Sequence, residues 1–200
     1  MEKNPLEEAG RASRTIDPCV VVIFGATGDL TGKRLLPALY NLGRDGLLPS
    51  NYAVVGFARR EKKHEEFRSE MKTAVATYSR VKPIDESVWA HFQERLFYHV
   101  SEFDNDEGYL ALDRFLKELD NRLGTKGNRV FYLSVQPKYF PIIIEKLKKV
   151  GLLYDPHQDE KWSRVIIEKP FGHDLQSAME LQKKISQYLD ESQTYRIDHY

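Results

Sequence analysis

Short runs of apolar residues recur along the chain, and each has the length of one buried β-strand. Most of them are apolar at consecutive positions, so both faces of such a strand must be covered, which is typical of a parallel sheet between helices. The runs predict strands at residues 19–25, 52–58, 95–100, 128–135, 164–169 and 194–198.

The segments between these runs carry apolar residues at helical spacing, and we expect these stripes to pack in the core. They lie at residues 67–78, 112–123, 140–147 and 175–189. Gly151 is placed to end the third helix, and Asp174 to cap the fourth. The alternation predicts an α/β fold: a doubly wound, mostly parallel, Rossmann-like sheet of about six strands with helices on both faces.

The first sixteen residues are polar and contain acidic as well as basic side chains. They have neither the apolar core of a secretory signal nor the acid-poor composition of a transit peptide. We interpret residues 1–16 as a disordered N-terminal tail, followed by one domain at residues 17–200.

Composition narrows the possible partners. The 30 basic and 30 acidic residues cancel, so the chain has no general attraction for nucleic acid or an anionic membrane. No segment is apolar over the length of a membrane span. Cys19 is the one cysteine, which excludes an internal disulfide bond and favours a reducing compartment. We therefore expect a cytoplasmic protein without a metal site, in which any bound anion is held by local groups.

The turn after the first predicted strand is rich in glycine and leads into a helical pattern. Its spacing is G-x-x-G-x-x-x-G, which differs from the G-x-G-x-x-G fingerprint. Gly25 and Gly28 allow the backbone to approach a ligand closely. Thr27 adds a hydroxyl group, and the helix that begins near Asp29 presents N–H groups to an anion, with Asp29 itself better explained as a helix cap. The turn therefore predicts a pyrophosphate site.

The end of the second predicted strand indicates which dinucleotide binds. An NAD-type site has an acidic residue there, which accepts hydrogen bonds from the adenosine ribose. This chain has Arg59 and Arg60 instead. A guanidinium can bind a 2′-phosphate through two hydrogen bonds and stack on adenine. We therefore expect NADP rather than NAD; the alternative is that both arginines are solvated charges at the start of a helix.

Five motifs resemble glucose-6-phosphate dehydrogenase in their order and their approximate spacing. They are GATGDL, GFARR, YLSVQP, EKPFG and RIDHY, and the resemblance covers residues 18–200. It implies oxidation of glucose 6-phosphate at C1 to 6-phospho-D-glucono-1,5-lactone with reduction of NADP, the first step of the pentose phosphate pathway. It also implies a larger second domain, absent from this chain, that carries much of the sugar site and the contacts of a homodimer or tetramer.

The resemblance also implies roles for individual residues. Arg59 is expected to hold the 2′-phosphate, while Glu102 and Phe103 are expected to border the adenine. Lys169 is similar to a lysine that reaches both coenzyme and sugar, and we expect it to be aimed by a cis bond to Pro170. The other residues implied to contact the coenzyme are Gly25, Ala26, Thr27, Gly28, Asp29, Leu30 and Tyr132.

The last three residues match the substrate side of the family's site. His199 and Tyr200 are similar to residues that bind the substrate phosphate, and Asp198 is similar to the carboxylate that orients the catalytic histidine. That histidine, the general base of the reaction, lies beyond this chain in the family. We therefore expect the isolated chain to lack turnover.

Two other functions are compatible with the glycine-rich turn. A short-chain-type NADP reductase or epimerase needs a Tyr-x-x-x-Lys pair on a helix, but Tyr78 and Lys82 run into a loop before Pro83. A non-catalytic NADP-sensing module predicts coenzyme binding without a sugar phosphate site, and EKPFG and RIDHY argue against it. From its position alone, Lys169 is equally well explained as a charge at the end of a strand.

Overall fold

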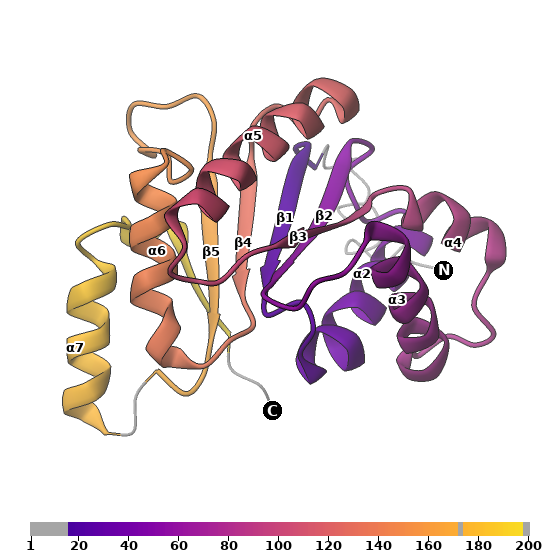
Figure 1. Ribbon diagram of the computed structural model, residues 1–200, viewed down its shortest axis with the longest axis horizontal. Coiled ribbons are helices and arrows are strands. Elements are labelled where there is room, and N and C mark those ends of the chain that lie inside the picture. The colour runs from indigo at the N-terminus through magenta and orange to yellow at the C-terminus, as the bar shows by residue number, and fades with distance from the viewer. Residues whose placement is uncertain (1–15, 172–173, 198–200) are drawn as a thin grey trace, which may run out of the picture.

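The centre of the molecule is a six-stranded sheet in which every neighbouring pair of strands is parallel (Figure 1). The computed structural model describes residues 16–171 and 174–197. The strands are β1 (Cys19–Phe24), β2 (Tyr52–Ala58), β3 (Leu96–Val100), β4 (Arg129–Leu133), β5 (Ser163–Glu168) and β6 (Thr194–Ile197). Their order is β3-β2-β1-β4-β5-β6. The order reverses between β1 and β4, the point at which such sheets bind ligands.

Helices cover the sheet from two sides, as the sequence predicted. Helices α2 (Leu36–Arg44), α3 (His64–Tyr78) and α4 (Glu86–Gln93) pack on one face, and α5 (Asp106–Leu123), α6 (Phe140–Lys149) and α7 (Leu175–Ile185) pack on the other. Short helical turns occur at η1 (Thr31–Leu35), η2 (Pro137–Tyr139) and η3 (Glu191–Gln193). Within the described segments, no helix has the length and apolar character needed to cross a membrane. The doubly wound, Rossmann-like fold is confirmed.

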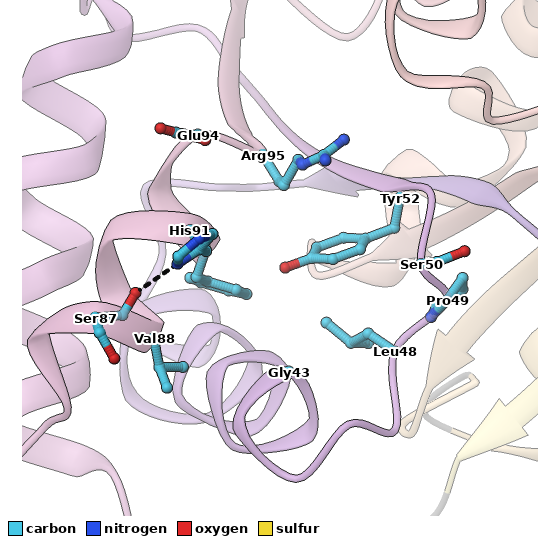
Figure 2. Close-up of a pocket in the computed structure, with 11 residues that line it drawn as sticks. Gly43, Leu48, Pro49, Ser50, Tyr52, Ser87, Val88, His91, Glu94 and Arg95 are labelled. Carbon is cyan, nitrogen blue, oxygen red and sulfur yellow. Dashed lines mark hydrogen bonds between the residues drawn. The ribbon is translucent and has the colours of Figure 1, made fainter.

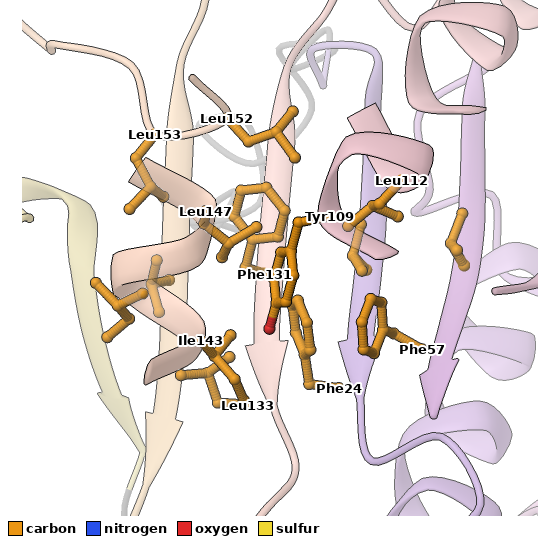
Figure 3. Packing of buried hydrophobic residues seen from close by; sticks show 14 of the residues in the cluster. Phe24, Phe57, Tyr109, Leu112, Phe131, Leu133, Ile143, Leu147, Leu152 and Leu153 are labelled. Carbon is orange, nitrogen blue, oxygen red and sulfur yellow. The ribbon is translucent and has the colours of Figure 1, made fainter. Parts of the chain in front are cut away.

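Strand β1 divides the core into two clusters because successive side chains point to opposite faces. Phe24 joins the larger cluster beneath α5 and α6, whereas Ile23 joins the cluster beneath α2, α3 and α4. Figure 3 shows Phe24 close to Phe57, Phe131 and Tyr109 in the larger cluster. Each fully buried side chain of this size contributes about 1.5–3 kcal/mol through removal from water.

One helical stripe is less buried than its pattern predicted. On α7, Leu175 is 76% exposed and Met179 is 63% exposed, while Ile185 is 2% exposed. The prediction that the whole stripe packs in the core was wrong at its N-terminal half. Tyr78, at the end of α3, is also 48% exposed. Apolar spacing identifies the apolar face of a helix, but it does not say how far the neighbouring elements extend along that face.

The predicted start of α7 and the predicted end of α6 are confirmed. The carboxylate of Asp174 accepts a hydrogen bond from the N–H of Ser177 at 2.8 Å and caps α7. Gly151 follows α6 with a φ of +74°, a conformation that suits glycine at a helix end. The predicted N-terminal tail lies outside the described residues, except for Ile16, which is 47% exposed.

Candidate coenzyme site

The predicted site residues follow strands that end at one edge of the sheet. Phe24, the last residue of β1, pairs in register with Phe57 of β2 and Leu133 of β4. Because the strands are parallel, the residues that follow these positions meet at the carboxyl edge. Gly25 and Arg59 are therefore brought to the same edge from adjacent strands.

Gly25 makes the tight turn after β1 and lies against the chain that follows β4. Its φ is +84°, and a Cβ built on it would lie 2.2 Å from the carbonyl oxygen of Ser134. Its N–H donates to the carbonyl oxygen of Phe57 at 2.9 Å. The prediction that Gly25 supplies a tight turn is consistent with this geometry, and the contact with Ser134 explains why no side chain fits there.

The loop after Gly25 closes on itself and leaves amide groups available for an anion. The N–H of Gly28 donates to the carbonyl oxygen of Gly25 at 2.9 Å, and the hydroxyl of Thr31 donates to the same oxygen at 3.2 Å. Within the described part of the chain, the N–H groups of Thr27 and Asp29 donate to no protein acceptor. They lie just before the helical turns, where an anion is favoured.

The first turns after this loop are irregular. The N–H of Leu36 donates to the carbonyl oxygen of Thr31, which widens the chain into the π-helical turn η1. Pro37, the next residue, has no N–H to restore the regular pattern. The prediction that Asp29 caps the helix was wrong, because its carboxylate accepts from Nζ of Lys33 at 2.7 Å and no side chain caps the first turn.

Arg59 lies directly after β2, with its side chain in solvent. The preceding Ala58 is 3% exposed, whereas Arg59 and Arg60 are exposed. Among the residues that the structure describes, neither arginine has an acidic partner within ion-pair distance. The guanidinium of Arg59 is thus available to a phosphate group at the carboxyl edge.

The residues after β3 lie beside Arg59. The N–H of Ser101 donates to the carbonyl oxygen of Ala58 at 3.1 Å, which joins the ends of β3 and β2. Glu102 is exposed. Phe103 is half-buried, and its ring centroid lies 5.1 Å from that of Tyr139. Glu102 and Phe103 thus follow β3 at the carboxyl edge, with the Phe103 ring packed toward Tyr139, and their contact with an adenine stays a prediction.

Tyr132 has an acidic partner that was not predicted from the sequence. Its hydroxyl donates to the carboxylate of Glu168, the last residue of β5. Burial, together with the hydrogen bond to Glu168 and the charge of that group, raises the pKa of Tyr132. The tyrosine therefore stays protonated and can act as a donor. Glu168 is the first residue of the EKPFG motif, and this motif was the sequence feature that could have identified Glu168 as a site residue.

Lys169 follows β5 at the same edge and is exposed. Its N–H donates to the carbonyl oxygen of Ile197 at 3.3 Å, so its backbone is tied to β6. The bond between Lys169 and Pro170 is cis, which confirms the expectation from the family resemblance. Asp198, His199 and Tyr200 lie outside the described residues, so their predicted roles stay predictions.

A separate cavity of about 400 Å³ lies at the other end of β2. Figure 2 shows the Tyr52 ring pointing toward His91 of α4, with Leu48 below it. Tyr52 is the first residue of β2 and Arg59 follows its last, so the cavity and the carboxyl edge are separated by the length of the strand. None of the predicted site residues lines it. This cavity therefore does not mark the candidate coenzyme site. The site is identified by the residue types at the carboxyl edge.

Comparison with known proteins identifies the family. Residues 22–200 match the sequence model described as "Glucose-6-phosphate dehydrogenase, NAD binding domain". This chain belongs to the glucose-6-phosphate dehydrogenase family. A "Glucose-6-phosphate 1-dehydrogenase" of Chlamydia pneumoniae is 56% identical over 188 residues, which are 94% of this chain and 36% of that protein.

Solved structures of glucose-6-phosphate dehydrogenases share this fold. A "Glucose-6-phosphate dehydrogenase in complex with its substrate glucose-6-phosphate" superimposes with a TM-score of 0.81 at 36% identity, over 94% of this chain and 38% of that chain. The enzyme from Mycobacterium avium gives a TM-score of 0.76 at 30% identity, over 90% and 36% respectively. The chain thus spans 36–38% of the length of these relatives.

The family assignment makes this chain a dehydrogenase coenzyme-binding domain. The matched description mentions NAD binding and does not distinguish NADP from NAD.

Proposed function

We propose that this chain binds NADP as the coenzyme domain of a glucose-6-phosphate dehydrogenase. The observation that carries the proposal is Arg59, which is exposed and has no ion-pair partner among the described residues. It occupies the end of β2, where an NAD site has an acidic residue. An acidic residue would repel a 2′-phosphate, whereas a guanidinium attracts it and can form two hydrogen bonds with it.

The rest of the edge fits a dinucleotide. The N–H groups of Thr27 and Asp29 are available for the pyrophosphate, and Gly25 allows the backbone turn that exposes them. Glu102 and Phe103 follow β3, whose end is joined to the end of β2 through Ser101 and Ala58, and they would border the adenine. Ala26, Gly28 and Leu30 complete the loop that we assign to the coenzyme.

The residues that we assign to the substrate lie near the ends of β4 and β5 and among the last residues of the chain. When bound, NADP supplies the acceptor for the hydride. Tyr132 and Lys169 lie near the ends of β4 and β5, where Lys169 would donate to the coenzyme and a sugar hydroxyl. We assign the substrate phosphate to His199 and Tyr200, and the positioning of the general base to Asp198.

The relatives support a proposal for the reaction. One related structure is described as holding glucose 6-phosphate as its substrate. We propose that the protein containing this chain oxidises the same sugar phosphate at C1 to 6-phospho-D-glucono-1,5-lactone. A homodimeric or tetrameric assembly and a cytoplasmic location stay predictions.

Coenzyme titrations of the Arg59→Ala variant test the proposal. We expect its Kd for NADP to rise about ten- to a hundredfold, equivalent to about 1.5–3 kcal/mol, because a charge-assisted contact is lost. Its Kd for NAD should change less than about twofold, since NAD has no 2′-phosphate. Isothermal titration calorimetry measures both values.

Arg114→Ala is the matched control. Arg114 is an exposed arginine within α5, so its removal should leave both coenzyme affinities unchanged. Equal losses of NADP and NAD affinity in Arg59→Ala would contradict a role at the 2′-phosphate.

A further inference from the structure

The segment that carries Arg59 is held at two points by one buried residue, Tyr98. This segment, Arg59–His64, connects β2 to α3. The hydroxyl of Tyr98 donates to the carbonyl oxygen of Arg60 at 2.6 Å. The backbone N–H of Tyr98 donates to Nδ1 of His64, the first residue of α3, at 3.0 Å. One side chain and its own backbone thus restrain both ends of the connection.

Tyr98 is itself fixed by its surroundings. It is 4% exposed, and its ring centroid lies 5.1 Å from that of Phe67. It pairs in register with Gly56, where a Cβ would lie only 2.8 Å from the Phe67 ring. Burial raises the pKa of Tyr98 to about 12, so the hydroxyl keeps its proton and remains a donor.

The middle of the connection is restrained as well. The N–H of Lys63 donates to the carboxylate of Glu66 at 2.8 Å, and Lys62 forms an ion pair with Glu70. The backbone of the segment is therefore held, while the guanidinium of Arg59 is exposed and has no acidic partner in the described segments. A restrained backbone reduces the ordering cost when such a side chain binds an anion.

We propose that Tyr98 is a positioning residue for coenzyme selection, which holds the Arg59–His64 segment so that Arg59 meets the 2′-phosphate. The inference rests on the proposed NADP function. It adds that discrimination between NADP and NAD depends on a buried hydroxyl on β3 that touches neither coenzyme. Without this hydroxyl the carbonyl of Arg60 loses its partner, and the adjacent guanidinium samples more orientations.

The test removes only the hydroxyl, in a Tyr98→Phe variant titrated with NADP and with NAD by calorimetry. The Kd for NADP should rise about three- to tenfold, since one neutral hydrogen bond is lost, while the Kd for NAD stays within about twofold. The readout is the ratio of the two constants, which a general loss of stability does not change.

Tyr40→Phe is the matched control. Tyr40 is also fully buried, and its hydroxyl bonds to the backbone of Asp85. It belongs to α2, and its hydroxyl bonds to Asp85 and not to the Arg59–His64 segment, so the ratio should stay at the wild-type value.

Each outcome of the comparison decides a different point. An unchanged ratio in Tyr98→Phe, with a selective loss of NADP in Arg59→Ala, overturns the role of Tyr98 and leaves the proposed function standing. Absence of a selective loss in Arg59→Ala overturns both. If Tyr98→Phe does not fold, His64→Ala removes the tether made by the backbone N–H of Tyr98, and an unchanged ratio in that variant overturns the claim that restraint of the Arg59–His64 segment by Tyr98 sets the selectivity.

Discussion

At the scale of single residues, the site depends on contacts between distant parts of the sequence. The glycine-rich turn could be predicted because its spacing after an apolar strand is local information. The neighbour that excludes a side chain at Gly25 is the carbonyl oxygen of Ser134, which directly follows β4, more than a hundred residues along the sequence. Likewise, the partner of Tyr132 is Glu168 on the next strand. The residue types were visible in the sequence, but their partners are set by the strand order.

Replacing Gly25 with alanine should be strongly destabilising. The positive φ costs about 1–2 kcal/mol for a residue with a Cβ, and the overlap with Ser134 adds about 1–3 kcal/mol. We expect a total loss of about 2–5 kcal/mol in the free energy of unfolding, measured by urea denaturation.

Gly46→Ala is the control for this variant, because Gly46 has a φ of +68° but no atom of the described residues lies within 4 Å of the position that a Cβ would take. Its free energy of unfolding should fall only by the cost of the positive φ, about 1–2 kcal/mol. Equal losses at the two positions would show that the contact with Ser134 is unimportant.

At the scale of elements, a buried ion pair joins α5 to β4. Arg129, the first residue of β4, is 1% exposed, and its Nη1 donates to the carboxylate of Asp120 at 2.8 Å. The hydroxyl of Thr125 and the N–H of Gly127 donate to the same carboxylate. Burial by itself would raise the pKa of Asp120, but the hydrogen bonds from Arg129 and Thr125 and the charge of Arg129 lower it. This carboxylate therefore orders the turn between the helix and the strand.

Asp120→Ala should reduce the free energy of unfolding by about 3–5 kcal/mol, because it leaves the buried guanidinium of Arg129 without its counter-charge. Lys117→Ala removes an exposed ion pair with Asp113 from the same helix and should cost less than about 1 kcal/mol. Similar values for the two variants in urea denaturation would refute the structural role of the buried pair.

Most elements could be predicted from the sequence, and the exceptions have physical causes. Every predicted strand is present, and most of them are continuous apolar runs; β6, which contains Arg196, is the exception. Helix α4 was missed, since it has only eight residues and buries two large side chains, Trp89 and Phe92. Helix α7 shows the opposite error. It was predicted correctly as a helix, but its apolar face is only partly covered, so Leu175 and Met179 are exposed.

At the scale of the whole molecule, the ends of several parallel strands lie at one edge of the sheet. Two neutral histidines lie near that edge. Nδ1 of His64 accepts from the N–H of Tyr98, and Nε2 of His99 bonds to the carbonyl oxygen of Gly108. Burial lowers the pKa of both histidines below 6.5, and the charge of Arg68 lowers that of His64 further. Their protonation is therefore coupled to unfolding.

Stability should consequently fall as the solution is acidified. The unfolded chain takes up protons at these histidines as the pH drops through 6.5, whereas the folded protein takes them up only at lower pH. The urea midpoint should thus be lower at about pH 5.5 than at about pH 7.5.

Replacing the buried histidines should reduce this dependence. In a His64→Gln, His99→Gln variant the difference between the two midpoints should shrink, while His91→Gln, at an exposed position, should leave it unchanged. A midpoint that stays constant or rises on acidification of the parent chain would contradict the assignment.

Whether Arg59 makes this chain an NADP-binding domain can be decided by a crystal structure of the chain with NADP bound. We predict that the 2′-phosphate lies within hydrogen-bond distance of the Arg59 guanidinium, and that the N–H groups of Thr27 and Asp29 donate to the pyrophosphate. A 2′-phosphate that lies away from Arg59, for example in the groove lined by Lys33 and Arg80, would contradict the assignment of Arg59.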